Sequence, residues 1–487
     1  MMSQPDISFI ILVDDASLQL NAAYLDTIIS HFKQTGLSHE FVVTACSLNQ
    51  DSKRLLDIHQ KHTPSFVVVE IGQQRDYGYK IKRGCLESSG KTLIILQLKE
   101  WLTPEQIQET YHAFVDNNAE ILFGSRQVKS EDESAEMAIT GLWQRLFSFL
   151  MRKYISNNVK DPLCGLKMLK RVAAEAVLPR IYFEDAGFNL EVIYLAEKMG
   201  YMIDSVPVSS EQAKPVNLKF LVNICLKIFQ IINWHCIPVN TQECNMSKDE
   251  FKSMYELENH HWWFVSLRLL VVGLVRSVGR SFPAILDVGS GTGGNMAVLS
   301  KIGNAYGIEI SQDAIDLCKE RGLENIAMSP VEAIKYPEES FDMITCINVL
   351  EHVYDPVKAL REIKRVLNKD GKAIVVVPAF RMLWSQHDEA LCHFRKFEKY
   401  SFLQDIEEAG LKTEKVGYFF FTSFFALAPL RIIKRLFSSN KKLETDTESL
   451  PPDIINRLLI FLFRLEAKLT KKITLPFGSS LYAVLSK

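Results

Sequence analysis

Residues 285–295 read ILDVGSGTGGN, an apolar strand that runs through Asp287 into a loop with glycines at positions 289, 291, 293 and 294. A glycine cluster directly after a buried strand lets the backbone turn sharply and approach a ligand closely. Its N–H groups and the N-terminus of the next helix then face that ligand. The glycines also satisfy the dinucleotide pattern GxGxxG. The loop therefore predicts a cofactor site and leaves the kind of cofactor open.

Three segments after the loop narrow the choice. AYGIEIS (305–311) places Glu309 at the end of a second apolar strand, where its carboxylate can bind a ribose hydroxyl pair in either type of cofactor. FDMITCINVLEHV (341–353) and LNKDGKAIVVVP (367–378) follow, the latter predicting a turn at Asp370 and Gly371 before a buried strand. Together with DVGSGTGG, this ordered set resembles a class I S-adenosylmethionine-dependent methyltransferase. A nicotinamide dehydrogenase is not expected to show the last two segments.

The resemblance implies S-adenosylmethionine as the cofactor and assigns roles within the loop. Asp287 is expected to orient the loop, or to meet the amino acid end of the cofactor through water. Gly289 and Gly291 allow the backbone to approach the cofactor, and Gly293 allows the following helix to pack closely. By the resemblance, Glu309 is the expected ribose ligand, and a charged residue that ends a buried strand has few purely structural explanations.

Further cofactor contacts are expected around the later strands. Glu332 lies where the family often carries an acid against the adenine amino group. Asn348, Glu351 and His352 close the fourth strand, and an open α/β sheet places its ligands beyond the carboxyl ends of its strands. The run HHWWF (260–264) precedes the first strand, where helices of this class commonly fold over the cofactor. Its tryptophans are alternatively core aromatics.

The acceptor of the methyl group is expected near PAFRMLWSQHDEALCHFRKF (378–397), which contains His387, Asp388 and His393. A histidine can remove the proton from a hydroxyl as the methyl arrives, and a neighbouring aspartate can fix its tautomer. The stretch resembles a methyltransferase subgroup with a comparable HD and HxRR-like pattern. His352 is the alternative base, and a solvated polar loop is the alternative reading. With no metal-ligand cluster in view, the sequence predicts a metal-free reaction.

The N-terminal half has five short apolar runs, ISFIILV, HEFVVTA, SFVVVEI, KTLIILQ and AEILFGSR, separated by helical or polar stretches. This succession predicts a second α/β domain with a mostly parallel sheet. From about Ile7 to Glu211, the segments RDYGYKIKRG, DPLCG and GFNLEV resemble a family 2 glycosyltransferase of the GT-A fold, nearest to the polyprenyl-phosphate sugar transferases. The resemblance implies a domain built to bind a sugar nucleotide.

Acids that this chemistry needs are missing. The family ends the KTLIILQLKE strand with an Asp-x-Asp pair that holds a divalent ion, whereas this chain has Gln97 and Lys99 there. Residues 44–46 are Thr, Ala and Cys where nucleoside-binding acids are expected. Asp161 and Glu191 match acceptor-side acids, or else cap a turn and face solvent on a helix, respectively. A degenerate binding domain is favoured, with metal-free sugar transfer as the alternative.

Length and composition frame these parts. The chain has 487 residues and suggests two domains, 1–240 and 241–487. Its formal charge of -2 argues against a nucleic-acid partner, and its nine cysteines lack CxxC spacing, which suggests reduced thiols and no zinc site. The N-terminal segment lacks a cationic region and is expected to be a strand, not a signal peptide. The expected location is cytoplasmic, with peripheral contact at the inner face of the membrane as an option.

The last strands, LKTEKVGYF and SSLYAVLSK, are expected to pair antiparallel around a helical insertion at about 420–474. The insertion is apolar and then basic at Arg431, Lys434 and Arg435, so its faces fit a membrane interface or packing inside the protein. We therefore expect a methyltransferase, acting on oxygen of a small-molecule, glycan or lipid-linked acceptor. The alternatives are a bifunctional enzyme that also transfers a sugar, and a non-catalytic binding protein.

Overall fold

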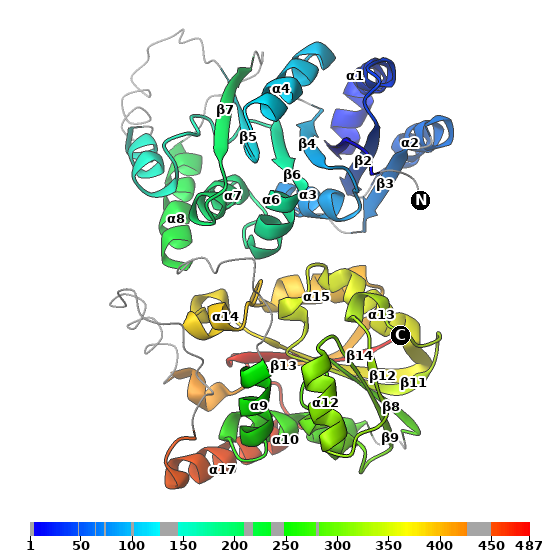
Figure 1. Ribbon diagram of the computed structural model, residues 1–487, viewed down its shortest axis with the longest axis vertical. Coiled ribbons are helices and arrows are strands. Elements are labelled where there is room, and N and C mark those ends of the chain that lie inside the picture. Colours follow the sequence, from blue (N-terminus) through cyan, green and yellow to red (C-terminus); the bar gives the residue numbers. More distant parts are fainter. Residues whose placement is uncertain are drawn as a thin grey trace. The chain divides into compact units, whose positions relative to one another are not determined.

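The computed structural model describes residues 4–46, 48–63, 65–72, 75–98, 102–126, 145–208, 218–234, 248–278, 282–425 and 450–487. The chain divides into two compact units, Met1–Thr241 and Gln242–Lys487. Each unit is built on a seven-stranded, mostly parallel sheet with helices on both faces (Figure 1). The predicted α/β class is confirmed for both.

The N-terminal unit has the strand order β3-β2-β1-β4-β6-β5-β7. The five predicted apolar runs form the first five strands: β1 (Ile7–Val13), β2 (His39–Cys46), β3 (Phe66–Ile71), β4 (Thr92–Gln97) and β5 (Ile121–Arg126). The remaining strands are β6 (Lys167–Lys170), which is antiparallel to β4 and β5, and β7 (Ile203–Val208), which is parallel to β5. One reversed strand in an otherwise parallel sheet agrees with the predicted GT-A-like topology.

Helices cover both faces of this sheet (Figure 1). One face packs on α1 (Asp15–Gln34), α2 (Gln50–His62) and α4 (Pro104–Asp116). The other packs on α3 (Tyr77–Leu86), α6 (Arg171–Val177), α7 (Gly187–Lys198) and α8 (Leu218–Trp234). Local sequence fixes where the helices start: Asp14 and Thr103 form capping boxes, and Pro104 occupies the first turn of α4.

The C-terminal unit has the strand order β10-β9-β8-β11-β12-β14-β13. Its strands are β8 (Ala284–Val288), β9 (Asn304–Glu309), β10 (Ile326–Met328), β11 (Phe341–Ile347), β12 (Leu367–Pro378), β13 (Lys412–Phe419) and β14 (Ser480–Ser486). β14 is antiparallel to both β12 and β13, so the predicted antiparallel final pair is confirmed. The order reverses at β8, and ligands of open α/β sheets bind beyond the strand ends at such a point.

One face of this sheet packs on α10 (Trp262–Ser277), α11 (Gly294–Leu299) and α17 (Asp453–Leu469). The other face packs on α13 (Pro356–Val366) and α15 (Lys399–Glu408). The outer elements include α9 (Lys248–Leu257), α12 (Gln312–Glu320) and α14 (Gln386–Ala390). Among the described helices, none combines the length and apolar content needed to span a bilayer.

Two predicted features of this unit need comment. The turn expected at Asp370 and Gly371 is a bulge inside β12, because the pairing with β11 jumps from Phe341–Leu367 to Met343–Lys372. The four residues between Leu367 and Lys372 thus fall at a register shift, and the strand continues through them. In the predicted insertion, α17 is described, whereas the basic residues at 431, 434 and 435 lie outside the described residues.

Candidate active site

The glycine loop joins β8 to α11 in an unusual backbone conformation. Gly289, Gly291 and Gly293 have φ values of 64°, 53° and 87°, a region that side-chain-bearing residues rarely adopt. A Cβ atom at Gly289 would lie 2.4 Å from Val349 Cγ2, and one at Gly293 would lie 2.6 Å from Leu323 Cδ1. The loop therefore needs glycine for backbone shape and for close packing, and the approach of Gly289 and Gly291 to a cofactor stays a prediction.

Glu309 is tied directly to this loop. Its Oε2 accepts a hydrogen bond from the Gly291 N–H at 2.9 Å, and its Oε1 accepts from the backbone of Ile310 at 2.8 Å and of Ser311 at 3.2 Å. A carboxylate has about four acceptor positions, so these three bonds leave capacity for a hydroxyl donor. The residue is thus held at the mouth of the loop, where the predicted ribose contact would lie.

Asp287 is almost fully buried beneath the loop. Its Oδ1 accepts a hydrogen bond from Thr345 Oγ1 at 2.6 Å, whereas its Oδ2 has no partner among the described residues. Burial, aided by the negative charges of Glu309 and Glu258, raises the pKa of Asp287 to about 7. An unpartnered buried carboxylate is stabilised by a cation or a donor. This orphaned oxygen fits a ligand that carries positive charge, as S-adenosylmethionine does.

The raised pKa of Asp287 gives a stability prediction. A folded-state pKa of about 7 against an ordinary value of 3.8 means that stability falls as the pH rises between these values. Without cofactor, Asp287→Asn should therefore stabilise the chain at pH 8, by a few kcal/mol, and change little at pH 4. Urea denaturation at both pH values measures this difference. An equal effect of Asp287→Asn at both pH values would show that the buried charge is not the cause.

Glu258, which sequence reasoning did not single out, also anchors the loop. It follows α9 and is buried, and its carboxylate accepts hydrogen bonds from Thr292 Oγ1 at 2.6 Å and from the Arg321 guanidinium at 2.5 Å. Arg268 lies 3.4 Å away on its other oxygen. Desolvation raises the pKa of Glu258. In the sequence, Glu258 looks like an ordinary charged residue in a polar run. Its partners Arg268, Thr292 and Arg321 come from three other segments, so the sequence around it does not reveal them.

Within the aromatic run 260–264, His261 is buried, and the partly buried Trp262 and Trp263 pack against the core. His261 caps α10 by accepting the Trp263 N–H at 3.2 Å, and burial lowers the pKa of its ring. Trp262 stacks on Phe463 of α17, with ring centroids 5.4 Å apart, and Trp263 stacks on Phe420. These contacts favour the core interpretation for both tryptophans.

The other expected cofactor residues lie near the carboxyl ends of β10 and β11. Glu332 is half-buried in a 3₁₀ turn, η4 (Val331–Ala333), which follows β10. Asn348 follows β11 with a φ of 53°, and its side-chain oxygen has no partner among the described residues. Such backbone strain is retained where surrounding structure demands it, often at binding sites. Both placements agree with ligand contacts, and the roles of Glu332 and Asn348 stay predictions.

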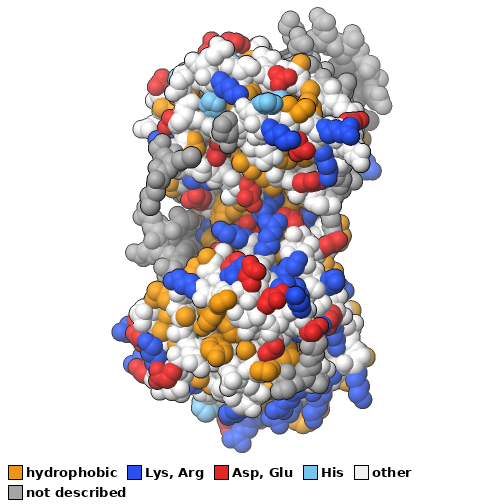
Figure 2. All heavy atoms as spheres, turned by 90° about the vertical axis from the view of Figure 1, so that its right-hand side faces the viewer, with side chains coloured by type: hydrophobic (Ala, Val, Ile, Leu, Met, Phe, Trp, Pro, Cys, Tyr) orange, Lys and Arg blue, Asp and Glu red, His pale blue; other side chains and the backbone are white. Residues whose placement is uncertain are grey.

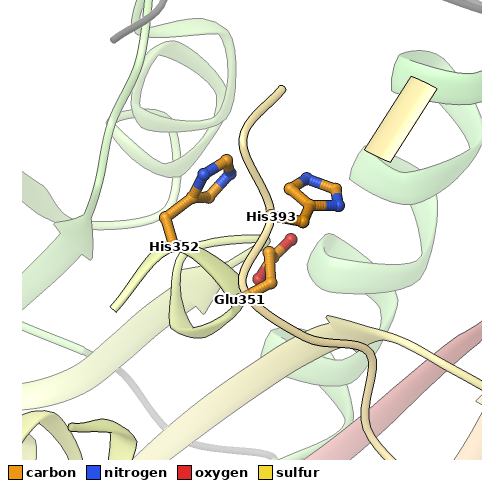
Figure 3. A group of neighbouring side chains, drawn as sticks. All are labelled: Glu351, His352 and His393. Atoms are coloured by element: carbon orange, nitrogen blue, oxygen red, sulfur yellow. The ribbon is translucent and has the colours of Figure 1, made fainter. Parts of the chain in front are cut away.

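A cluster of Glu351, His352 and His393 occupies the expected acceptor side (Figure 3). Glu351 and His352 lie in the short 3₁₀ turn η5 (Leu350–His352), and His393 follows α14. The rings of His352 and His393 are 4.7 Å apart, and one ligand atom from each of the three residues lies within 4.8 Å of the others. The sequence gives these residues separate roles and predicts a metal-free reaction. Their grouping in the structure makes them candidate metal ligands.

Electrostatic surroundings differ sharply within the cluster. Glu351 is 1% exposed and neither carboxylate oxygen has a hydrogen-bond partner among the described residues. Desolvation raises the pKa of Glu351 to about 8. His352 keeps an exposed surface, yet desolvation by its surroundings, together with repulsion from His393, lowers its pKa. The cluster thus combines a buried acid in need of a partner with a neutral imidazole.

Asp388 connects this cluster to α14. Its Oδ1 lies 2.9 Å from Nδ1 of His393 and 2.6 Å from Nζ of Lys396, and its Oδ2 accepts the Ser385 N–H at 2.8 Å. Since a carboxylate accepts, Nδ1 of His393 is the donor and Nε2 carries the lone pair. The predicted tautomer-fixing role falls on His393, while the His387 ring lies 6.3 Å from that of His393. Burial of Asp388 and His393 argues against a solvated loop.

The acids singled out in the N-terminal unit hold structure together. Asp161 pairs with the Arg126 guanidinium at 2.7 and 3.0 Å and accepts the Leu163 N–H at 3.1 Å, as a turn cap does. Glu191 is fully buried, which excludes the alternative that it faces solvent, and it accepts two backbone N–H groups at 2.8 Å. Gln97 ends β4, and Lys99 lies outside the described residues.

Comparison with known proteins agrees with this division. A family model described as a methyltransferase domain matches residues 286–375, from β8 into β12. An uncharacterized methyltransferase of Bacillus subtilis, YcgJ, is 31% identical over 104 residues, covering 20% of this chain and 41% of that protein. A ubiquinone biosynthesis O-methyltransferase of Coxiella burnetii is 26% identical over 145 residues, covering 27% and 62%.

The N-terminal region matches a dolichyl-phosphate beta-glucosyltransferase of Dictyostelium discoideum, 24% identical over 184 residues, covering 36% of this chain and 56% of that protein. The chain thus spans between 41% and 62% of these relatives. The fold defines an α/β protein of two compact units, with a glycine-rich loop after the first strand of the C-terminal sheet. More particularly, its C-terminal half carries a methyltransferase domain, which implies S-adenosylmethionine as cofactor, and its N-terminal region is glycosyltransferase-like.

Proposed function

We propose that the C-terminal unit transfers the methyl group of S-adenosylmethionine to an oxygen of its acceptor. The observation that carries this proposal is the continuity between the two sides of the site. Gly289 packs against Val349, two residues before Glu351, and the Glu351 carbonyl accepts the Phe394 N–H at 2.8 Å. The glycine loop and the histidine cluster therefore lie next to each other beyond the carboxyl ends of β8 and β11. The O-methyltransferase name of one relative supports oxygen as the nucleophile.

The bound cofactor supplies an electrophilic methyl group on a cationic sulfur. The chain has three tasks: Glu309 and the loop N–H groups hold the cofactor, Asp287 balances its positive charge, and the acceptor side handles a proton. As the acceptor oxygen forms its bond to the methyl carbon, the sulfur–methyl bond breaks and the hydroxyl proton must leave. The histidine cluster is placed to assist that departure, with Asp388 orienting His393.

The acceptor class is a small molecule, a glycan or a lipid-linked molecule, and α17 favours the last. Its outer face shows five apolar side chains that are between 43% and 83% exposed: Ile454, Leu458, Phe461, Leu465 and Leu469. Phe463 and Ala467 on the opposite face are buried against α10. Exposed cations flank the outer stripe on and just after the helix: Arg457, Arg464, Lys468, Lys471 and Lys472.

An apolar stripe beside cations fits the interface of an anionic membrane. α17 lies at the lower end of the C-terminal unit in Figure 1, and Lys and Arg side chains gather at that end in Figure 2. These side chains support our proposal that the chain is cytoplasmic and makes a peripheral contact with the inner face of the membrane. The formal net charge of -2 gives no support for a nucleic-acid partner.

A double variant in which glutamate replaces both Leu458 and Leu465 should bind anionic vesicles at least about tenfold more weakly. Two apolar side chains then leave the interface, and two negative charges enter it. Vesicle sedimentation measures the bound fraction. The matched control replaces Ile58 and Val115, exposed apolar residues of α2 and α4, with glutamate. Equal loss in both double variants would show a general charge effect and would remove the case for α17.

For the N-terminal unit we propose a degenerate glycosyltransferase-like domain that acts as a binding domain and does not transfer a sugar. Gln97 and Lys99 replace the metal-holding acids, and the remaining acids at 161 and 191 are engaged in ion pairing or backbone capping. A bifunctional enzyme is the alternative, and sugar-nucleotide binding that depends on magnesium or manganese would favour it. A third alternative is a binding protein without catalysis.

Calorimetric titration of the full chain with S-adenosylmethionine tests the proposed function directly. We expect one molecule bound per chain, because one glycine loop of this kind is described. Absence of binding would reject methyl transfer and favour the non-catalytic alternative.

A further inference from the structure

Glu351, His352 and His393 form a donor set that the proton chemistry alone does not account for. One carboxylate and two imidazoles bring their ligand atoms within 4.8 Å of one another (Figure 3). Glu351 is 1% exposed, with both oxygens unpartnered among the described residues. Burying a carboxylate without hydrogen bonds costs several kcal/mol unless another group compensates. The arrangement therefore calls for a positively charged or proton-donating occupant.

We propose that this triad binds a divalent transition-metal ion, with zinc as the representative. Mixed imidazole and carboxylate ligands suit zinc and neighbouring transition metals, whereas magnesium and calcium are usually held by oxygen ligands. The proposal rests on the proposed function and specifies the part played there by His393, which holds the cation. Glu351 supplies the negative charge, and His352 supplies the second imidazole.

The surroundings of the triad resemble the support that metal-binding histidines receive. Asp388 is fully buried and lies 2.9 Å from Nδ1 of His393, which directs Nε2 as the ligand atom. A carboxylate on the far nitrogen of a histidine fixes the ring and strengthens it as a ligand. The hydrogen bond between the Phe394 N–H and the Glu351 carbonyl joins the two segments that carry the ligands. Asp388 is therefore a positioning residue.

Three protein ligands leave room for a further ligand. His352 has an exposed surface, so the triad is open to molecules from solvent. A metal ion there would polarise the acceptor hydroxyl and promote loss of its proton to water, while the oxygen gains the methyl group and the sulfur–methyl bond breaks. The acceptor class that fits is one whose reacting hydroxyl, alone or with a neighbouring oxygen, can bind a metal.

The test uses the full chain after removal of metals with a chelator. Calorimetric titration with Zn²⁺ and optical titration with Co²⁺ should show one ion bound per chain, with cobalt absorption bands typical of a protein ligand set. Glu351→Gln and His393→Asn should each weaken binding more than about tenfold, and Asp388→Asn should weaken it about 10- to 100-fold. His62→Asn, an exposed histidine of α2, serves as the control and should leave binding unchanged.

Circular dichroism and S-adenosylmethionine titration of each variant report whether it is folded, so a lost metal is not confused with a lost fold. No bound ion in the parent chain, or binding that these variants leave unchanged, overturns the proposal. If the cofactor binds and metal does not, the metal site fails while the proposed function stands. If metal binds and cofactor does not, the proposed function fails instead.

Discussion

Replacing Gly291 with arginine should abolish S-adenosylmethionine binding, lowering affinity by more than about 100-fold, equivalent to about 2.7 kcal/mol. Gly291 donates its N–H to Glu309 at 2.9 Å and has a φ of 53°, so a side chain there strains the loop beside the expected ribose ligand. Among the described residues, the only atom within 4 Å of an added Cβ is Cε at the flexible end of the Met254 side chain, at 2.8 Å. The fold itself should therefore survive, and calorimetry should report the loss as a binding defect.

The matched control is Gly200→Arg. Gly200 also has a positive φ, of 79°, and open space around an added Cβ, and it belongs to the N-terminal unit. This variant carries the same charge and the same kind of backbone strain without touching the loop. Unchanged S-adenosylmethionine binding in Gly200→Arg, with lost binding in Gly291→Arg, would show that the loss of affinity arises at the glycine loop. Retained binding in Gly291→Arg would mean that the cofactor site has been assigned wrongly.

Asp388→Asn should lower the rate of methyl transfer by about 10²-fold or more and change cofactor affinity less than twofold. The substitution keeps the shape of the side chain but removes the charge that holds His393 and pairs with Lys396. His393 can then adopt the other tautomer and present a donor where an acceptor or ligand is needed. Single-turnover kinetics with saturating cofactor measure the chemical step separately from cofactor binding.

Asp355→Asn provides the comparison for this variant. Asp355 is a buried aspartate of the same unit that caps α13 through the backbone of Val357 and Lys358. Asparagine is a comparable cap, so folding and rate should change little. If both variants lose activity to the same extent, general destabilisation explains the loss. If the Asp388→Asn variant keeps full activity, the histidine cluster does not take part in the reaction.

The sequence predicts those parts of the site that depend on neighbours along the chain. The glycine loop, Glu309 and the residues after β11 follow directly from a strand, a turn and a helix in succession. The same holds for the positions of the strands, because apolar runs mark them along the chain, whereas the order of the strands within each sheet comes from the structure. Local rules of backbone conformation and strand periodicity are sufficient for these features.

Contacts between distant segments are what sequence reasoning misses. Glu258 binds Thr292 and Arg321, which come from the loop and from the end of α12, and nothing near Glu258 in the sequence signals either partner. Glu191 lies in α7, where both faces of the helix are buried, so the alternative that it faces solvent is wrong. The triad of Glu351, His352 and His393 likewise forms only because the fold brings His393, which follows α14, next to η5.

The most direct test of methyl transfer incubates the full chain with S-adenosylmethionine labelled on its methyl group and an extract of lipids and glycans. We predict that label enters a discrete acceptor, recovered as an oxygen-linked methyl group by mass spectrometry, and that the Gly291→Arg chain transfers none. No labelled product from the parent chain despite cofactor binding, or equal labelling by the Gly291→Arg chain, would contradict the assignment of this site as a methyltransferase.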